Sequence, residues 1–169
     1  MSPSWTIVWS FIVAATLLSV GFGLSVEKGL LPIRATIAYS DRQLQFMDVW
    51  VKIALLIGVI VPVILLVVFW NNPVLRQFWG CYLLVVTIQI GTEISLSRIL
   101  CKSAVVIVGT LYTGFRIWQL WEGMPLLTGN LPWLGLMWLV WLFWVANLIM
   151  LFTLAIPCIL PDRSEGSTS

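Results

Sequence analysis

The sequence contains no histidine and few charged residues. Of its 169 residues, 9% are charged, whereas about 25% is usual in soluble domains. Without histidine, the chain lacks the commonest ligand of haem and zinc and the commonest general base. Its 9 basic and 7 acidic residues are spread thinly, so no basic patch is available for nucleic acid. These absences exclude nucleic-acid binding and disfavour most enzyme chemistries.

Cysteine is scarce and scattered. Cys81, Cys101 and Cys158 are far apart and show no C-x-x-C spacing. An odd, dispersed set predicts packing residues rather than a disulfide framework or a metal site. No segment brings a nucleophile, a base and an orienting group together, so we predict no catalytic residues and no enzyme.

Apolar residues dominate what is present. The chain is 60% hydrophobic, has a mean hydropathy of +1.03 and contains 11 Trp. Indole suits a bilayer because its body lies in lipid while its N–H reaches the headgroups. We therefore predict one membrane domain, residues 1–161, followed by a disordered polar tail, 162–169.

The fold class expected is all-α: a polytopic membrane helix bundle with five transmembrane helices, or four in the alternative count. The predicted spans are about 5–26, 50–70, 77–97, 103–121 and 133–156. Residues 1–4 carry no Lys or Arg, so we expect the first span to be retained rather than removed as a secretory signal.

Two features of the middle spans need interpretation. A single straight helix over residues 77–121 would be ~68 Å long, more than twice the hydrocarbon thickness. We therefore break it between Arg98 and Ser103, although no Gly or Pro marks a turn there. In the second span, Gly58 and Pro62 predict a bend, which is either a tolerated irregularity or a hinge.

Residues 27–48 form the longest predicted loop. Its last part, DRQLQFMDVW from residue 41, places Leu44, Met47 and Val51 at helical spacing. This pattern predicts a short amphipathic surface helix that leads into the second span.

The distribution of Lys and Arg predicts orientation. With five spans, seven basic residues fall on one side and two, Arg76 and Arg116, on the other. Because cytoplasmic loops are enriched in Lys and Arg, we expect the N-terminus outside and the C-terminus in the cytoplasm.

Glu93 is the most unusual residue of the predicted spans. An ionisable group deep in a bilayer costs ~2.5–3.5 kcal/mol by insertion scales, so Glu93 needs a partner there. Ser97 lies one turn away on the same helix face, whereas Arg98 lies too far round the helix to pair well. Two interpretations stay open: a buried polar site, or a cytoplasmic turn in which water solvates Glu93, Arg98 and Lys102.

Further along the chain, a helical wheel groups Arg98, Lys102, Gly109, Tyr112 and Arg116 on one face. Such a stripe could hold an anionic headgroup or a carboxylate. The alternative is that Arg98 and Lys102 extend to one membrane interface and Arg116 to the other.

In the last span, Trp138, Trp141 and Trp144 predict a packing face, and Asn147 is expected to hydrogen-bond to another helix. The candidate polar centre therefore comprises seven residues: Glu93, Ser97, Arg98, Lys102, Tyr112, Arg116 and Asn147.

Two resemblances accompany these residues. The stretch EISLSR, 93–98, resembles the pigment-ligand pattern of chlorophyll a/b-binding and high-light-inducible proteins, but Leu96 stands at a ligand position and cannot hold magnesium. The stretches YTGFRIWQL from Tyr112, FWVANL from Phe143, and the final prolines resemble an uncharacterised plant transmembrane-protein family, a domain of unknown function. That resemblance, confined to the C-terminal half, implies a photosynthetic lineage and a thylakoid or plasma membrane.

The function expected is that of a non-enzymatic multipass membrane protein, an accessory or assembly subunit acting through helix contacts. The alternative is a small transporter or channel with a polar centre around Glu93, Arg98 and Asn147. We expect no cofactor and no metal, with pigment or lipid as the alternatives. The expected partners are the lipid bilayer and a membrane-protein partner or a second copy of the chain.

Overall fold

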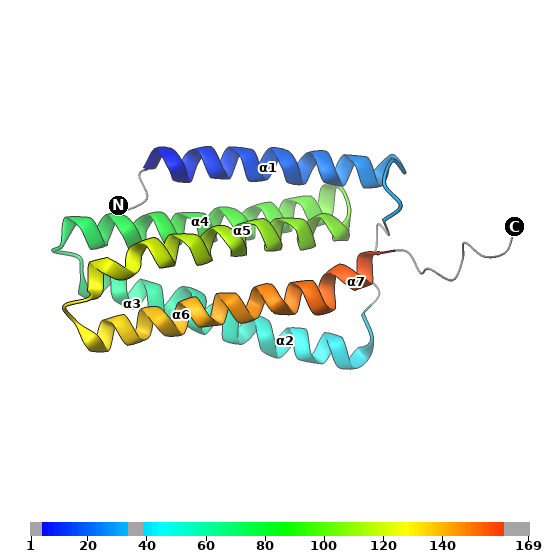
Figure 1. Cartoon of the computed structure of the whole chain (residues 1–169). Helices are drawn as coiled ribbons and strands as arrows, with labels where there is room; N and C mark the ends of the chain where they lie inside the picture. The colour runs from blue at the N-terminus through cyan, green and yellow to red at the C-terminus, as the bar shows by residue number, and fades with distance from the viewer. Residues whose placement is uncertain (1–4, 34–38, 161–169) are drawn as a thin grey trace, which may run out of the picture.

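The computed structural model describes residues 5–33 and 39–160, and in these ranges every regular element is helical. The predicted all-α fold is confirmed. Five long rods lie side by side (Figure 1). They are α1 (Trp5–Glu27); α2 (Asp41–Leu55), η1 (Leu56–Ile60) and α3 (Val61–Val68) in one rod; α4 (Pro73–Ile99); α5 (Lys102–Gly123); and α6 (Leu131–Met150), η3 (Leu151–Ala155) and α7 (Ile156–Ile159) in one rod. A 3₁₀ turn, η2 (Met124–Leu127), follows α5.

The rods form a ring of four with one rod outside it. The α2–α3 rod packs against α4 and α6, and α5 packs against α4 and α6, which closes the ring. The outer helix, α1, lies along α4 and α5 (Figure 1). At one end of the bundle α1 ends, α2 begins, and α4 turns into α5.

Four rods are long and apolar enough to cross a membrane: Trp5–Glu27, Asp41–Val68, Pro73–Ile99 and Leu131–Ile159. These candidate spans indicate an integral membrane protein. The fifth rod, α5, is about 33 Å long at roughly 1.5 Å per residue. It is less apolar, but it contacts α1, α4 and α6, so neighbouring helices rather than solvent cover many of its residues. That surrounding protein is what allows α5 to carry polar side chains.

Local sequence explains where the rods begin and end. Ser40 and Gln43 form a capping box that starts α2, and the Asn72 side chain accepts from the first free N–H groups of α4. After α1, Gly29 adopts a φ of 68°, which ends the helix in a left-handed cap.

The α2–α3 rod is longer than the span predicted at 50–70. Sequence analysis assigns residues 27–48 mainly to a loop, whereas the helix begins at Asp41 and continues for 28 residues to Val68. The capping box starts the helix here, and the amphipathic stretch runs into the apolar one without a break. The predicted surface helix and the second span are therefore one rod.

The turn between α4 and α5 consists of Leu100 and Cys101, inside the interval where sequence analysis breaks the 77–121 run. Cys101 is extended, with φ −140° and ψ 152°, so it cannot continue the helix. Gly23 of α1 lies against this turn: a Cβ built on Gly23 would be 2.8 Å from Leu100 Cδ1. Two residues are therefore enough to reverse the chain between α4 and α5, where a Gly- or Pro-rich loop is more usual.

Both proline-containing rods widen just before their proline. The π-helical turn η1 precedes Pro62, and the π-helical turn η3 precedes Pro157. Because proline has no N–H, the carbonyl four residues back loses its helical partner. For Pro62 that carbonyl belongs to Gly58, and it accepts a hydrogen bond from Tyr82 Oη at 2.9 Å instead. The bend predicted from Gly58 and Pro62 is thus a π-helical turn repaired by α4.

Several predictions fall on residues outside the described ranges. The polar tail, 162–169, is one of them, and so are Arg34 and Arg163 of the charge count. Of the other basic residues assigned to the cytoplasmic side, Lys28, Arg42, Arg98 and Lys102 lie near the ends of the helices that meet where α4 turns into α5. Lys52 lies about 16 Å along the α2–α3 rod from its first residue.

Candidate functional site

A cavity of about 350 Å³, the central cavity, lies within the ring of four rods. Side chains from α2, η1, α4, α5, α6 and η3 line it, and most of them are apolar. Its polar lining residues include Gln89 and Glu93 of α4, Arg116 of α5 and Asn147 of α6. Both π-helical turns contribute to the wall, so the two irregular turns help to shape the space.

Arg116 is the most unusual of these residues because it is a cation enclosed by protein. Its side chain is 2% exposed, and its Cζ lies 4.1 Å from the centre of the Trp144 ring. A desolvated cation–π contact contributes roughly 2 kcal/mol, somewhat less than the ~2.5–3.5 kcal/mol cost of an arginine at a membrane-helix centre. No hydrogen bond joins the guanidinium to another described residue, and its Nε is buried without a partner. Trp144 therefore offsets the charge but satisfies none of its N–H groups.

Glu93 supplies the opposite charge. It accepts a hydrogen bond from Gln89 Nε2, one helical turn earlier, while Gln89 Oε1 is buried without a partner. Glu93 and Arg116 lie within electrostatic range of each other. They do not form an ion pair: in the described ranges the ion pair present is that of Lys52 and Asp48, at 2.6 Å on the surface. The cavity thus holds an acidic and a basic side chain that do not contact each other.

Asn147 joins three rods beside the cavity. Its Oδ1 accepts from Trp50 Nε1 at 2.7 Å, and its Nδ2 donates to Thr113 Oγ1 at 3.1 Å. The predicted interhelical hydrogen bonding of Asn147 is therefore confirmed. Because α2 has no buried residue, this bond and the stacking of Trp50 on Phe143, with ring centroids 5.3 Å apart, help to hold α2 to the bundle.

A second chain of hydrogen bonds fixes the aromatic ring under Arg116. Trp144 Nε1 donates to Tyr82 Oη at 2.6 Å, and Tyr82 Oη donates to the Gly58 carbonyl. Gly58 also lies directly against the Trp144 ring. The π-helical turn of the α2–α3 rod therefore positions Trp144, and Trp144 in turn positions the cation.

The central cavity opens on the flank of the bundle. Val51 and Leu55 of α2 and Ile90 of α4 line the cavity, yet they are 50%, 47% and 40% exposed. Residues that line a cavity and also face outward form the rim of its opening, so the opening lies between α2 and α4. Ile90 lies about 13 Å along α4 from Ile99, which places this opening against the hydrocarbon rather than the headgroups.

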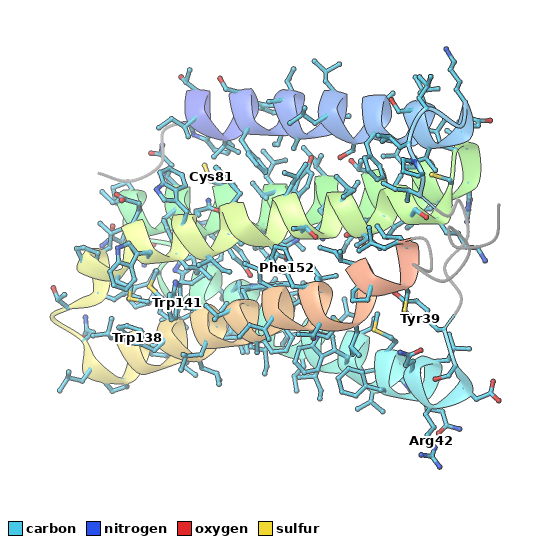
Figure 2. All side chains as sticks on the ribbon, turned by 45° about the vertical axis from the view of Figure 1, so that its right-hand side comes forward. Tyr39, Arg42, Cys81, Trp138, Trp141 and Phe152 are labelled. Carbon is cyan, nitrogen blue, oxygen red and sulfur yellow. The ribbon has the colours of Figure 1, made fainter. Side chains whose placement is uncertain are left out.

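Tyr39 lines the cavity at the end of the bundle near α7 (Figure 2). Burial raises the pKa of the Tyr39 phenol, and the neighbouring Cys158 thiol raises it further. The phenol is therefore neutral and remains a hydrogen-bond donor throughout the physiological pH range.

The structure places the seven predicted site residues in three different surroundings. Glu93, Arg116 and Asn147 meet at the central cavity. Arg98 and Lys102 are exposed on either side of the α4–α5 turn, and Ser97 bonds to the Ile94 carbonyl of its own helix.

Tyr112 faces α1 instead, where its ring lies edge-to-face with the ring of Phe11, with 5.2 Å between the ring centroids. The predicted cation stripe on one helix is therefore wrong, because the turn at Leu100 and Cys101 places Arg98 on α4 and the other members on α5. The extension of Arg116 to the membrane interface is also wrong, since Trp144 holds its side chain inside the bundle.

Sequence reasoning missed Gln89 as a site residue. Its spacing from Glu93, one helical turn, could have indicated it. Sequence analysis predicts that Trp144 belongs to a packing face and that Trp50 marks the start of the second span. Nothing in the sequence shows that the first lies under Arg116 and that the second bonds Asn147.

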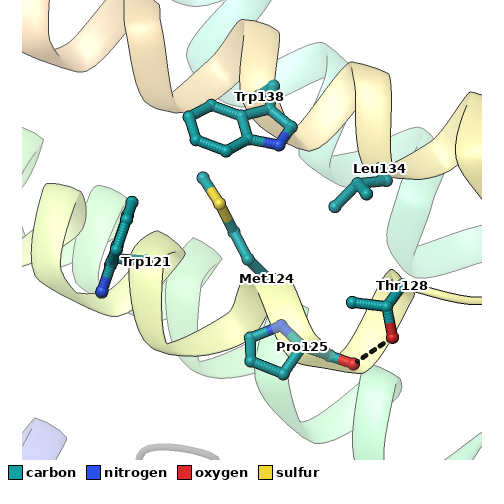
Figure 3. Close-up of a pocket in the computed structure, with 6 residues that line it drawn as sticks. All are labelled: Trp121, Met124, Pro125, Thr128, Leu134 and Trp138. Atoms are coloured by element: carbon teal, nitrogen blue, oxygen red, sulfur yellow. Dashed lines mark hydrogen bonds between the residues drawn. The ribbon is translucent and has the colours of Figure 1, made fainter.

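A second cavity, of about 360 Å³, lies at the other end of the bundle, around η2 (Figure 3). Trp121, Met124, Pro125, Leu134 and Trp138 form its walls with Thr128, whose hydroxyl donates to the Pro125 carbonyl at 3.1 Å. No charged residue lines it. The central cavity is therefore the better candidate site.

Comparisons with protein families, with curated proteins and with solved structures find no match for this chain. The resemblance to a plant transmembrane family stays a prediction, and the site is interpreted from its own geometry.

Proposed function

We propose that this protein is a non-enzymatic, five-span membrane protein that binds a ligand with an anionic group in the central cavity, as a small transporter or carrier does. The observation that carries this proposal is Arg116, a buried cation that lines the cavity with an unpartnered Nε. A carboxylate or phosphate is the group whose geometry matches the donors of a guanidinium.

Energetics supports a ligand at Arg116. A buried donor without a partner costs about 1–3 kcal/mol, and more when it is charged. An arginine used only for packing would be replaced by an apolar side chain with little loss, because buried charges seldom add stability. An anionic ligand recovers the hydrogen bonds that the protein itself leaves unmade.

Of the two roles predicted from sequence, the transporter has the more specific support. Its polar centre is revised: Arg116 takes the place that sequence analysis gives to Arg98. The accessory role rests on exposed apolar faces, which lipid covers equally well, and it stays a prediction. We also propose that the end of the bundle carrying Arg98 and Lys102 faces the cytoplasm.

Binding of dodecyl ethyl phosphate, an anionic phosphodiester with one alkyl chain, to the protein in dodecyl maltoside tests the proposal. We expect Arg116→Gln to weaken binding at least about tenfold, the equivalent of roughly 1.4 kcal/mol. Arg116→Lys should fall between Arg116→Gln and the wild type, because it keeps the charge but loses the planar fork.

Arg76→Gln is a matched control, since Arg76 also lies over a tryptophan ring, 5.6 Å from the centre of Trp70, but is exposed and outside the cavity. Circular dichroism verifies that each variant keeps its helix content. Equal binding by Arg116→Gln and the wild type would refute the proposal.

A further inference from the structure

The central cavity contains an acidic group as well as a basic one, and the two lie at different depths. A Cβ built on Gly109 would be 3.7 Å from Glu93 Oε1, so Glu93 lies beside Gly109. Arg116 follows two turns later on α5, about 10 Å further along the axis. The acidic and the basic side chain therefore lie at two separate levels of the cavity.

A simple anion suits only half of this arrangement. Bound at Arg116, it would satisfy the guanidinium, but Glu93 would repel it across a cavity of low dielectric. A ligand with a second, positive group removes that conflict, because an ammonium donates to Glu93 and to the free Gln89 Oε1. Each charge in the cavity then has a partner of opposite sign.

The flank opening indicates how such a ligand enters. Val51, Leu55 and Ile90 rim the opening, and all three are apolar. Ile90 lies about one helical turn further from the α4–α5 turn than Glu93, and Arg116 lies in the same direction. A chain attached to a headgroup in the cavity can therefore leave sideways into the hydrocarbon. A ligand arriving from water would not need an apolar rim at that depth.

We propose that the ligand is a zwitterionic amphiphile drawn from the bilayer, with its phosphate or carboxylate at Arg116, its ammonium at Glu93, and its alkyl chain between α2 and α4. This inference rests on the proposed function and specifies its ligand. Trp50, bonded to Asn147, is the group that holds α2 beside the entering chain.

Two probes that differ only in the ammonium test the pairing with Glu93. Dodecyl phosphoethanolamine is zwitterionic, and dodecyl ethyl phosphate carries the same phosphodiester without the amine. We expect the wild type to bind the zwitterion about tenfold more tightly or better. Glu93→Gln should abolish this preference and bind the plain anion at least as tightly as the wild type does, which also shows that the variant is folded.

Glu122→Gln is the matched control, because Glu122 lies near the end of α5 and does not line the cavity. It should keep the wild-type preference. Equal affinity of the wild type for the two probes, or a preference that survives Glu93→Gln, would overturn the zwitterion assignment and leave the anion site intact. Equal binding of dodecyl ethyl phosphate by Arg116→Gln and the wild type would instead refute the proposed function.

A third probe separates the lipid source from a soluble one. Methyl phosphoethanolamine, which keeps the phosphodiester and the ammonium but has a methyl group in place of the dodecyl chain, should bind at least about tenfold more weakly than the dodecyl form, because each buried methylene contributes ~0.8 kcal/mol in transfer from water. Equal binding of the methyl and dodecyl probes would overturn entry from the bilayer.

Discussion

Replacing Gly58 by alanine tests whether the π-helical turn holds Trp144 in place. A Cβ at this position would lie 2.4 Å from Trp144 Cζ2 and 3.2 Å from Trp144 Cε2. Carbon atoms pack at roughly 3.5–4.0 Å, so the ring or the rod must move by more than about 1 Å. The ring is held by its bond to Tyr82, which limits its freedom to move.

We expect Gly58→Ala to lower the free energy of unfolding by about 1–3 kcal/mol, the usual cost of overpacking a filled core. Gly80→Ala is the matched control, because nothing lies within 4 Å of a Cβ built on Gly80, which is also helical. That change should be neutral or stabilising by up to about 1 kcal/mol, since alanine favours helix over glycine. The two substitutions add the same methyl group, so their difference measures the contact.

The assay is reversible unfolding in mixed dodecyl maltoside and sodium dodecyl sulfate micelles, followed by circular dichroism. Because Arg116 lies over the displaced ring, Gly58→Ala should also weaken binding of dodecyl ethyl phosphate. Equal stability of the Gly58→Ala and Gly80→Ala proteins would show that Trp144 is not fixed by this contact.

Three further changes test other parts of the structure. A double-mutant cycle of Trp50→Phe and Asn147→Leu should give a coupling free energy of about 0.6–1.7 kcal/mol, and a coupling of zero would mean that their hydrogen bond does not hold α2. Tyr82→Phe leaves the Gly58 carbonyl without its donor and Trp144 Nε1 without its acceptor, and it should cost at least about 1–3 kcal/mol in unfolding free energy. The same change should cost less in a Pro62→Ala background, where a backbone N–H becomes available, and an unchanged cost would contradict the role given to the proline. A single cysteine at Ile99, which is exposed beside the α4–α5 turn, should react with an impermeant maleimide from the cytoplasmic side alone, whereas labelling from outside would reverse the proposed orientation.

Much of the fold could be predicted because bilayer thickness limits helix length. The break in the 77–121 run follows from that limit alone, and it falls at Leu100 and Cys101 although neither residue type signals a turn. The start of the second rod could not be placed in the same way. Composition changes near Trp50, but the capping box at Ser40 decides where the helix begins.

The candidate site was only partly predictable for a different reason. Glu93 and Asn147 stand out because polar groups are costly in an apolar segment, and that argument needs no structure. Arg116 stands out equally, but its position does not tell whether the side chain reaches an interface or stays inside. The deciding contact is with Trp144, a residue from another rod, and spacing along one helix cannot reveal it.

Pro62 and Pro157 connect the fold to the site. Each follows a π-helical turn, and each turn contributes residues to the wall of the central cavity: Val59 from η1, and Leu151 and Ala155 from η3. Straight α-helices would pack more closely at these points, since a π-helical turn inserts an extra residue and widens the rod. Each proline removes one backbone hydrogen bond of its rod. For Pro62, the hydroxyl of Tyr82 replaces the lost donor to the Gly58 carbonyl. A chain that needed only to pack its rods would gain from regular helices at both positions, so the retained irregularity favours a cavity that is used.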